Sequence, residues 1–258
     1  MTTAPTMPEG DSIRRDAVKL APLIGQAIVR VTTQGLERDL VGRVIASITP
    51  YGKHMTIGLD DGTEIRVHRG IRGGFSAVSR ADGEAWLAGM SPGRASLALV
   101  VAGAIYLWRD ARTVEISPRR GAQRGLAVAA LGPDVMADDF DSVAAAARAR
   151  VHDARMICDV LLDQRVVAGI GNIFKNEALF ACGVDPRARV AQLSDTQLAA
   201  LFGDAHVRMR SPRGDYGVYG RSNQPCRTCR KTLHIASLGD PPRWTWYCPQ
   251  CQPPGVSG

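Results

Sequence analysis

The hydrophobic pattern near the start of the chain is that of a helix. In SIRRDAVKLAPLIGQ, residues 12–26, the apolar side chains Ile13, Ala17 and Leu20 recur at the spacing of one helical face. Asp11 or Ser12 is the expected N-cap, because a short polar side chain there accepts a hydrogen bond from a backbone N–H of the first turn. Taken alone, the preceding Pro8 predicts no more than the entry to this helix.

Between residues 27 and 116 the pattern changes to short alternating runs, which are AIVRVTT, GRVIASITPYG, MTIGLDDGTEIRVH and TVEIS. Alternation is the period of a half-buried strand, and the Asp-Gly in LDDGTEI predicts a tight hairpin. The most apolar run, LALVVAGAIYLW at 97–108, is twelve residues long. It is too short to cross a bilayer and predicts one or two buried strands. Several strands joined by tight turns favour an antiparallel sandwich or barrel.

Helical patterns return after PRRGAQR, residues 118–124, a Pro/Gly/Arg stretch that is the expected domain boundary in this chain of 258 residues. Four apolar-faced segments follow, namely LGPDVMADDFDSVAAAARAR, ARMICDVLLDQRVV, NIFKNEALFACG and SDTQLAALFGDAHVRMR. AGIGN, residues 168–172, separates the second from the third. Its backbone N–H groups suit a phosphate, but spacing alone favours an ordinary tight turn with Asn172 as an N-cap.

Charge is concentrated at the C-terminal end. Residues 206–258 hold eight Lys or Arg against two Asp, a net charge of +6 out of +7 for the whole chain. Clustering of one sign favours a polyanion such as nucleic acid, although a basic surface that serves solubility is the simpler alternative. Residues 1–12 show no secretory leader, so we expect a cytoplasmic, bacterial protein.

Four of the six cysteines form the pairs CRTC and CPQC, with eighteen residues between the pairs. Two C-x₂-C pairs at this separation are typical of a zinc ribbon, in which four thiolates hold one structural Zn²⁺. The predicted ligands are Cys226, Cys229, Cys248 and Cys251. A reducing cytosol makes disulfides the weaker explanation. Cys158 and Cys182 lie in apolar, helical stretches and are expected to be small core residues.

Three segments together resemble one family. They are MPEGDSIRR at residues 7–15, LLDQRVVAGIGNIFKNEALFACGVDP at 161–186 and VYGRSNQPCRTC followed by RWTWYCPQCQ at 218–252. The sequence is similar in this respect to the formamidopyrimidine-DNA glycosylase/endonuclease VIII family of base-excision repair enzymes. The resemblance implies an α+β multidomain fold. In this fold, residues 7–118 are expected to form an N-terminal antiparallel β-sandwich with a flanking helix. Residues 119–215 are expected to form a helix–two-turn–helix domain, and residues 216–253 a zinc finger.

The resemblance also implies roles for individual residues. Pro8 takes the place of the family's N-terminal nucleophile, whose terminal secondary amine is less basic than a lysine and is unprotonated more often near neutrality. Glu9 matches the general acid/base, and Lys53 matches a lysine that contacts phosphate and assists proton transfer. Asn172 and Arg243 match residues that grip DNA phosphates.

Several positions depart from the family pattern. Relatives carry HLGM[ST]G where this chain has HRGIRGG, so Ile71 or Arg72 is expected to fill the gap left by a flipped base. Relatives carry DxRxFG where this chain has DARTVE, which keeps Arg112 but replaces the stacking Phe with Val114. The carboxylate often found three residues after Glu9 is Ser12 here.

From this resemblance we expect a monomeric bifunctional DNA glycosylase and AP lyase that acts on damaged DNA in the bacterial nucleoid, without a membrane or a soluble cofactor. The opening PEGDSIRR and the short segment before VYGR favour the endonuclease VIII-like branch and oxidised pyrimidines. The active form should begin at Pro8, since an amide nitrogen cannot attack a sugar carbon. The alternatives are a non-catalytic damaged-DNA-binding protein, if Pro8 is not exposed as the N-terminus, and a zinc-ribbon protein of the ribosome or of transcription.

Overall fold

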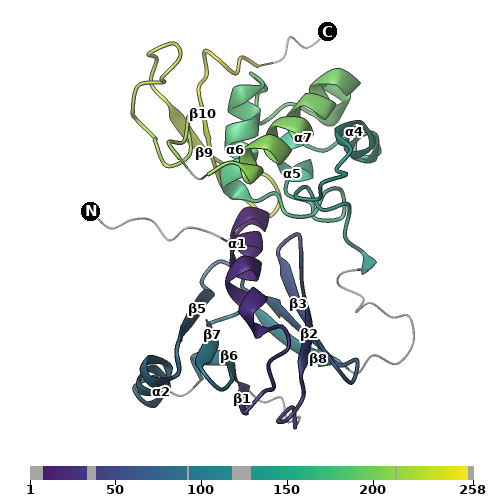
Figure 1. Cartoon of the computed structure of the whole chain (residues 1–258). Coiled ribbons are helices and arrows are strands. Elements are labelled where there is room, and N and C mark those ends of the chain that lie inside the picture. Colours follow the sequence, from purple (N-terminus) through teal and green to yellow (C-terminus); the bar gives the residue numbers. More distant parts are fainter. Residues whose placement is uncertain (1–7, 34–38, 92, 118–128, 213, 255–258) are drawn as a thin grey trace. The chain divides into compact units, whose positions relative to one another are not determined.

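The computed structural model describes residues 8–33, 39–91, 93–117, 129–212 and 214–254 (Figure 1). The predicted boundary at 118–124 and the predicted start at Met7 lie outside these residues. The chain divides into two compact units, residues 1–129 and 130–258. The remaining division, between a helical domain and a zinc finger at residue 216, stays a prediction.

The N-terminal unit is built from two four-stranded antiparallel sheets. One has the order β2-β3-β4-β8, with β2 Ile45–Tyr51, β3 His54–Leu59, β4 Glu64–His68 and β8 Thr113–Ser117. The other has the order β1-β6-β7-β5, with β1 Arg30–Thr33, β6 Ala95–Val100, β7 Ala104–Arg109 and β5 Gly74–Ser79. Apolar side chains of both sheets form one core with helix α1, Gly10–Leu20, and the 3₁₀ turn Ala21–Leu23. The predicted antiparallel sandwich is confirmed.

Local patterns predicted several elements of this unit correctly. The hairpin at LDDGTEI joins β3 to β4, and Gly62 has a φ of +82°, which a residue with a side chain rarely adopts. The apolar run at 97–108 forms β6 and β7, whose middle residues are buried. Ile13 and Leu20 of α1 are buried and Ala17 packs against the same core.

Two features of the N-terminal unit were not predicted. The N-cap of α1 is Glu9 rather than Asp11 or Ser12, because the helix begins at Gly10 and Ser12 already lies in its first turn. Helix α2, Arg80–Ala88, covers the outer face of the sheet β1-β6-β7-β5. Its signal in the sequence is the S-x-x-D spacing of Ser79 and Asp82, where the Ser79 hydroxyl accepts a hydrogen bond from the Asp82 N–H at 3.2 Å.

The C-terminal unit is helical with a small ribbon. Its elements are α4 Ser142–Arg150, α5 Ile157–Val160, α6 Asn172–Ala181, the 3₁₀ turn Val190–Gln192, α7 Asp195–Arg210, and the antiparallel pair β9 His234–Leu238 and β10 Arg243–Tyr247. Ser194 caps α7 as its sequence predicts, and Cys158 is buried in the core of this unit. Burial raises the pKa of the Cys158 thiol to about 11.

The predicted helix at ARMICDVLLDQRVV is wrong over most of its length, since only Ile157–Val160 is helical. Beyond it the backbone is bound by side chains instead. The Asp163 carboxylate accepts a hydrogen bond from the Arg165 N–H at 3.0 Å, and the Gln164 amide bonds the main chain of Leu162, Gly169 and Ile170. Such local bonds compete with helix formation. The predicted helix of residues 131–150 likewise begins only at Ser142, after the capping residue Asp141.

Of the helices in the described part of the chain, none is long and apolar enough to span a lipid bilayer.

Candidate functional site

The start of α1 holds the first two predicted site residues. Pro8 is half-buried, and Glu9 is completely buried as the N-cap. The Glu9 N–H donates to the Ser12 hydroxyl at 3.0 Å, and the same hydroxyl donates to the Glu9 carbonyl oxygen at 2.8 Å. Ser12, where relatives often carry a carboxylate, therefore fixes the main chain of Glu9.

The turn between β2 and β3 presents Lys53. Gly52 begins this two-residue turn with a φ of +53°, and the strands close directly behind it through the pair Tyr51 and His54. Helix α1 packs against both β2 and β3. The fold of the N-terminal unit thus places the helix that begins after Glu9 on the same hairpin that carries Lys53.

A histidine pair next to Lys53 was not predicted. His54 and His68 are direct cross-strand partners on β3 and β4, and their ring centroids lie 4.7 Å apart. Burial lowers the pKa of both imidazoles to about 4, with a further contribution from the nearby Arg66 for His54 and from His54 for His68. Both rings are therefore neutral near pH 7. The sequence contained a signal for this histidine pair, because the Asp-Gly turn sets the register of the hairpin and this register places His54 opposite His68.

The turn after β4 carries Ile71 and Arg72, and both side chains are exposed. Ile71 is 52% exposed and is one of several large apolar side chains at the surface of the described residues. The Arg112 N–H donates to the Arg69 carbonyl oxygen at 3.2 Å, so the two segments that depart from the family pattern lie side by side.

In the C-terminal unit, helix α6 holds β10 through buried polar side chains. The Asn172 side-chain N–H donates to the Trp244 carbonyl oxygen at 2.9 Å, the Lys175 ammonium to the Thr245 hydroxyl at 2.8 Å, and the Trp246 N–H to the Asn176 side-chain oxygen at 3.0 Å. Asn172 is the first residue of α6 and Gly171 is its N-cap, so the predicted capping alternative for Asn172 is wrong.

Two exposed side chains open strand β10. Arg243 is its first residue and is exposed, and Trp244 is 59% exposed. Their backbone is held by two contacts. The Asn172 side chain donates to the Trp244 carbonyl oxygen, and Arg243 pairs with Leu238 at the end of the β9–β10 ladder. The Arg243 side chain is thereby offered to solvent from a rigid strand.

A second buried carboxylate organises the entry to the ribbon. Glu177 on α6 accepts three consecutive backbone N–H groups, from Gly217 at 2.7 Å, Val218 at 3.0 Å and Tyr219 at 2.9 Å. Arg221 then binds the carbonyl oxygens of Gly217 and Pro225 at 2.6 and 3.0 Å. The Arg221 Nε also donates to the Gln224 side-chain oxygen at 3.1 Å, so this side chain is bound within its own turn.

The four predicted metal ligands meet in the ribbon. The sulfur atoms of Cys226, Cys229, Cys248 and Cys251 all lie within 4.8 Å of one another, with Cys226 to Cys251 at 3.9 Å and Cys229 to Cys248 at 3.4 Å. Zn–S bonds of about 2.3 Å in a tetrahedron put the sulfurs about 3.8 Å apart. The cluster fits a tetrahedral metal ion.

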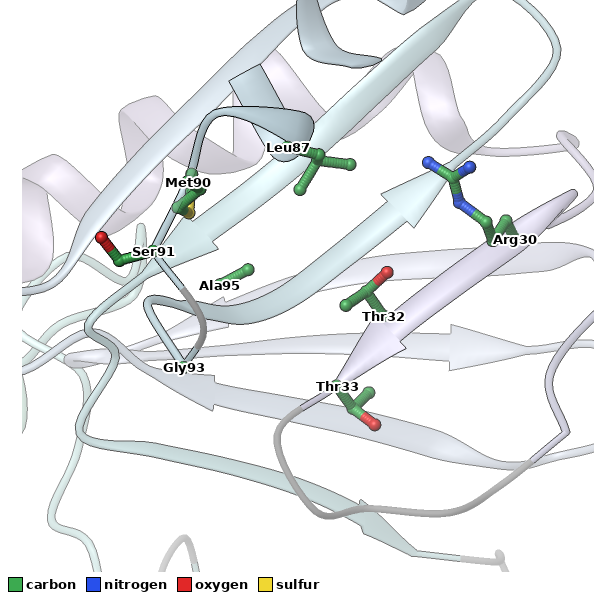
Figure 2. A pocket seen from close by; sticks show the side chains of 8 residues that line it. All are labelled: Arg30, Thr32, Thr33, Leu87, Met90, Ser91, Gly93 and Ala95. Atoms are coloured by element: carbon green, nitrogen blue, oxygen red, sulfur yellow. The ribbon is translucent and has the colours of Figure 1, made fainter. Parts of the chain in front are cut away.

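A pocket of about 460 Å³ lies elsewhere in the N-terminal unit, between β1 and the end of α2 (Figure 2). None of the predicted site residues is among the described residues that line it. Arg30 at its edge is paired with Glu84 at 2.6 Å. The pocket is thus separate from the residues around Glu9 and Lys53.

The predicted site residues fall into two groups. Pro8, Glu9, Lys53, Ile71, Arg72 and Arg112 belong to the N-terminal unit, and Asn172, Arg243 and the four cysteines to the C-terminal unit. The first group includes the Glu9 carboxylate and the Lys53 amine, and the second includes the Arg243 guanidinium, the Asn172 amide and a cluster of four thiols that could hold a metal ion.

Comparison with known proteins adds to this geometry. The family model described as the formamidopyrimidine-DNA glycosylase H2TH domain matches residues 131–211. The chain is 32% identical over 265 residues to endonuclease 8 2 of Mycobacterium tuberculosis, covering 95% of this chain and 100% of that protein. It is also 32% identical to the DNA-(apurinic or apyrimidinic site) lyase Nei2 of Mycolicibacterium smegmatis, over 95% of this chain and 99% of that one.

Solved structures show the same fold. The formamidopyrimidine-DNA glycosylase of Lactococcus lactis, bound to DNA with an AP site, matches with a TM-score of 0.81 at 20% identity, covering 95% of this chain and 100% of that chain. The MutM (Fpg) protein of Thermus thermophilus matches with a TM-score of 0.77 at 25% identity, covering 95% and 98%.

Proposed function

The chain belongs to the formamidopyrimidine-DNA glycosylase/endonuclease VIII family and is a base-excision DNA glycosylase with AP-lyase activity, and from this premise we propose that it removes oxidised bases through the nitrogen of Pro8. The observation that carries the proposal is the buried N-cap Glu9, which directly follows Pro8 and heads a helix packed on the Lys53 hairpin. A bacterial cytoplasmic location, with the chromosome as the site of action, is part of the same proposal.

The reaction proceeds in two stages. The Pro8 nitrogen attacks C1′ of the damaged nucleotide, the N–C1′ bond forms, and the glycosidic bond breaks as the base leaves with its electron pair and takes up a proton. The Pro8 nitrogen loses its proton, the C1′–O4′ bond breaks as O4′ takes up a proton, and the ring-opened sugar is left as an iminium ion. Its positive charge accepts electrons from the C2′–H bond, so the 3′ phosphate leaves by β-elimination, and the 5′ phosphate leaves by δ-elimination. Hydrolysis of the iminium returns the free amine.

Glu9 is the proposed general acid and base for the sugar ring, and Lys53 assists the proton steps and binds phosphate. Both proton carriers need a fixed place, since a misplacement of about 1 Å costs about 100-fold in rate. The reciprocal hydrogen bonds of Ser12 hold the main chain of Glu9, and the two-residue turn holds Lys53. These contacts support a preorganised site.

The grip on DNA is proposed to come from Arg243, Asn172 and Arg112 on phosphates, with Ile71 or Arg72 filling the space of the flipped base. The rigid, exposed setting of Arg243 supports its part. The Asn172 side-chain amide donates one N–H to the Trp244 carbonyl oxygen, and its second N–H is the proposed donor to a phosphate.

One structural Zn²⁺ is the proposed occupant of the cysteine cluster. Four thiolates in tetrahedral arrangement are the donor set of structural zinc, whose ligand positions are all filled by protein. Zinc supplies a cross-link here and no chemistry. Cys248 lies one residue beyond β10, so the ion would hold the end of the strand that begins with Arg243.

Oxidised pyrimidines are the proposed principal substrates. Support comes from the opening PEGDSIRR and from the short path between α7, which ends at Arg210, and Gly217, which is bound to Glu177. This path leaves little chain for a long loop over an oxidised purine.

The test uses two forms of the protein, one that retains residues 1–7 and one that begins at Pro8, each mixed with abasic-site DNA and borohydride. The short form should give a covalent adduct that Pro8→Gly weakens, and the long form almost none. Trapping of equal extent by a verified intact long form would assign the nucleophile to an internal lysine, first of all Lys53. Binding of abasic DNA without trapping by either form would favour a non-catalytic binder.

A further inference from the structure

The turn between β4 and β5 is closed by the side chain of its first residue. The Arg69 guanidinium donates to the Gly73 carbonyl oxygen through Nε at 3.2 Å and Nη2 at 3.1 Å. Its remaining nitrogen, Nη1, forms an ion pair with Asp16 of helix α1. One planar group thus binds both the far end of the turn and the helix that begins after Glu9.

The backbone of this turn has little freedom of its own. Gly70 has a φ of +68°, and a Cβ added there would meet the Arg112 Cβ at 2.8 Å. A Cβ on Gly73 would lie 2.0 Å from the Arg69 carbonyl oxygen. The turn therefore winds tightly over Arg69, and only Ile71 and Arg72 at its crest are exposed.

The ion pair is nearly buried, with 17% of the Arg69 side chain and 9% of the Asp16 side chain exposed. A buried pair adds little net stability compared with apolar residues of similar size, although the loss of one partner is costly because a charge is left without compensation. The family pattern has leucine at the position of Arg69, which needs no partner. The charged pair is therefore a feature of this chain that stability alone does not explain.

We propose that Arg69 and Asp16 are positioning residues that hold the crest Ile71–Arg72 at a fixed place relative to helix α1. Through this link, the residue that fills the gap in the duplex is aligned with the helix end that carries the nucleophile. Neither residue touches the reacting atoms. The inference rests on the proposed function of Ile71 and Arg72 as gap-filling residues.

The experiment measures gap filling without chemistry. A duplex with a non-cleavable tetrahydrofuran site opposite 2-aminopurine reports insertion of a side chain as a change in fluorescence at saturating protein. The main variant is Arg69→Leu combined with Asp16→Ala, which removes both buried charges together. The matched control is Arg30→Leu combined with Glu84→Ala, which removes an exposed ion pair from the same unit.

The double variant at Arg69 and Asp16 should unfold within a few degrees of the wild type and bind the duplex within about threefold, but lose at least four-fifths of the fluorescence change. The control should keep it. A full fluorescence change in the folded double variant would overturn the proposal, whatever the nucleophile is. Failure of the Pro8 assignment appears separately, as missing borohydride adducts in the wild type.

Single-turnover rates give the second readout. Excision of an oxidised pyrimidine from a duplex should fall at least tenfold in the double variant, while strand cleavage at an abasic site in single-stranded DNA, where no partner strand leaves a gap, should stay within twofold. An equal fall in both rates would show general damage to the unit and would also overturn the proposal.

Discussion

Replacement of Glu177 by glutamine tests how the C-terminal unit holds the entry to its ribbon. The carboxylate is 3% exposed and accepts the N–H groups of Gly217, Val218 and Tyr219 at 2.7–3.0 Å. Successive N–H groups that converge in this way form an anion-binding concavity. Glutamine keeps the shape of the side chain, but one of its two terminal atoms is a donor and faces an N–H group.

The cost follows from the three bonds. Two of them remain as neutral hydrogen bonds and lose about 1 kcal/mol each, and the third becomes a donor–donor contact that leaves a buried N–H unsatisfied, at about 1–3 kcal/mol. Glutamine is easier to bury than a carboxylate, which offsets part of the loss. We expect the free energy of unfolding to fall by about 2–4 kcal/mol, which lowers the melting temperature of a unit of this size by about 10 °C.

Thermal unfolding followed by circular dichroism, with the full chain and zinc present, measures this shift. The control is Asp195→Asn, the same chemical change at a side chain that is 84% exposed and paired with Arg150. Its effect should stay below about 1 kcal/mol. If Glu177→Gln melted together with this control, the three bonds would not stabilise the unit and the reasoning from their geometry would be refuted.

Three further predictions concern metal, salt and pH. Cys248→Ser should release zinc, measured by a chelating dye, and should sharply weaken DNA binding. Arg243→Ala should weaken DNA binding while zinc is retained. Lesion processing at the wild-type rate by the Arg243 variant would contradict the proposed role of Arg243. Affinity should fall steeply with salt, and Lys53→Ala should flatten the log–log slope by about one unit, so a salt-independent affinity would exclude the phosphate contacts. His54 and His68 have folded-state pKa values near 4, below the ordinary 6.5, so the unfolded chain takes up protons first as the pH falls. The melting temperature of the N-terminal unit should therefore decrease from about pH 6.5 to 4, and it should decrease less when both histidines are glutamine.

Much of the candidate site could be predicted because its features are local. The C-x₂-C pairs determine which four cysteines come together, and the Asp-Gly turn sets the register of β3 and β4. Ser194 caps α7 because its partner Gln197 is three residues away. In each case the interacting groups are a few positions apart, so the sequence contains the whole interaction.

The sequence-based prediction was wrong where side chain–backbone hydrogen bonds outweighed a local preference for helix. The stretch 154–167 has an apolar helical face, yet only Ile157–Val160 is helical, because the side chains of Asp163 and Gln164 bind the backbone that a longer helix would have used. Helix propensity is a weak term beside such bonds.

The tertiary structure alone decided the buried polar contacts. Asp16 and Arg69 are 53 positions apart, and Glu177 and Gly217 are 40 apart. In the sequence each is an ordinary charged or small residue of a helix or turn. Only packing removes these side chains from water, and a charge without water must find a partner wherever the fold supplies one. For that reason the pattern of residues predicted candidate groups for the chemistry, while the fold determined the contacts that hold them in place.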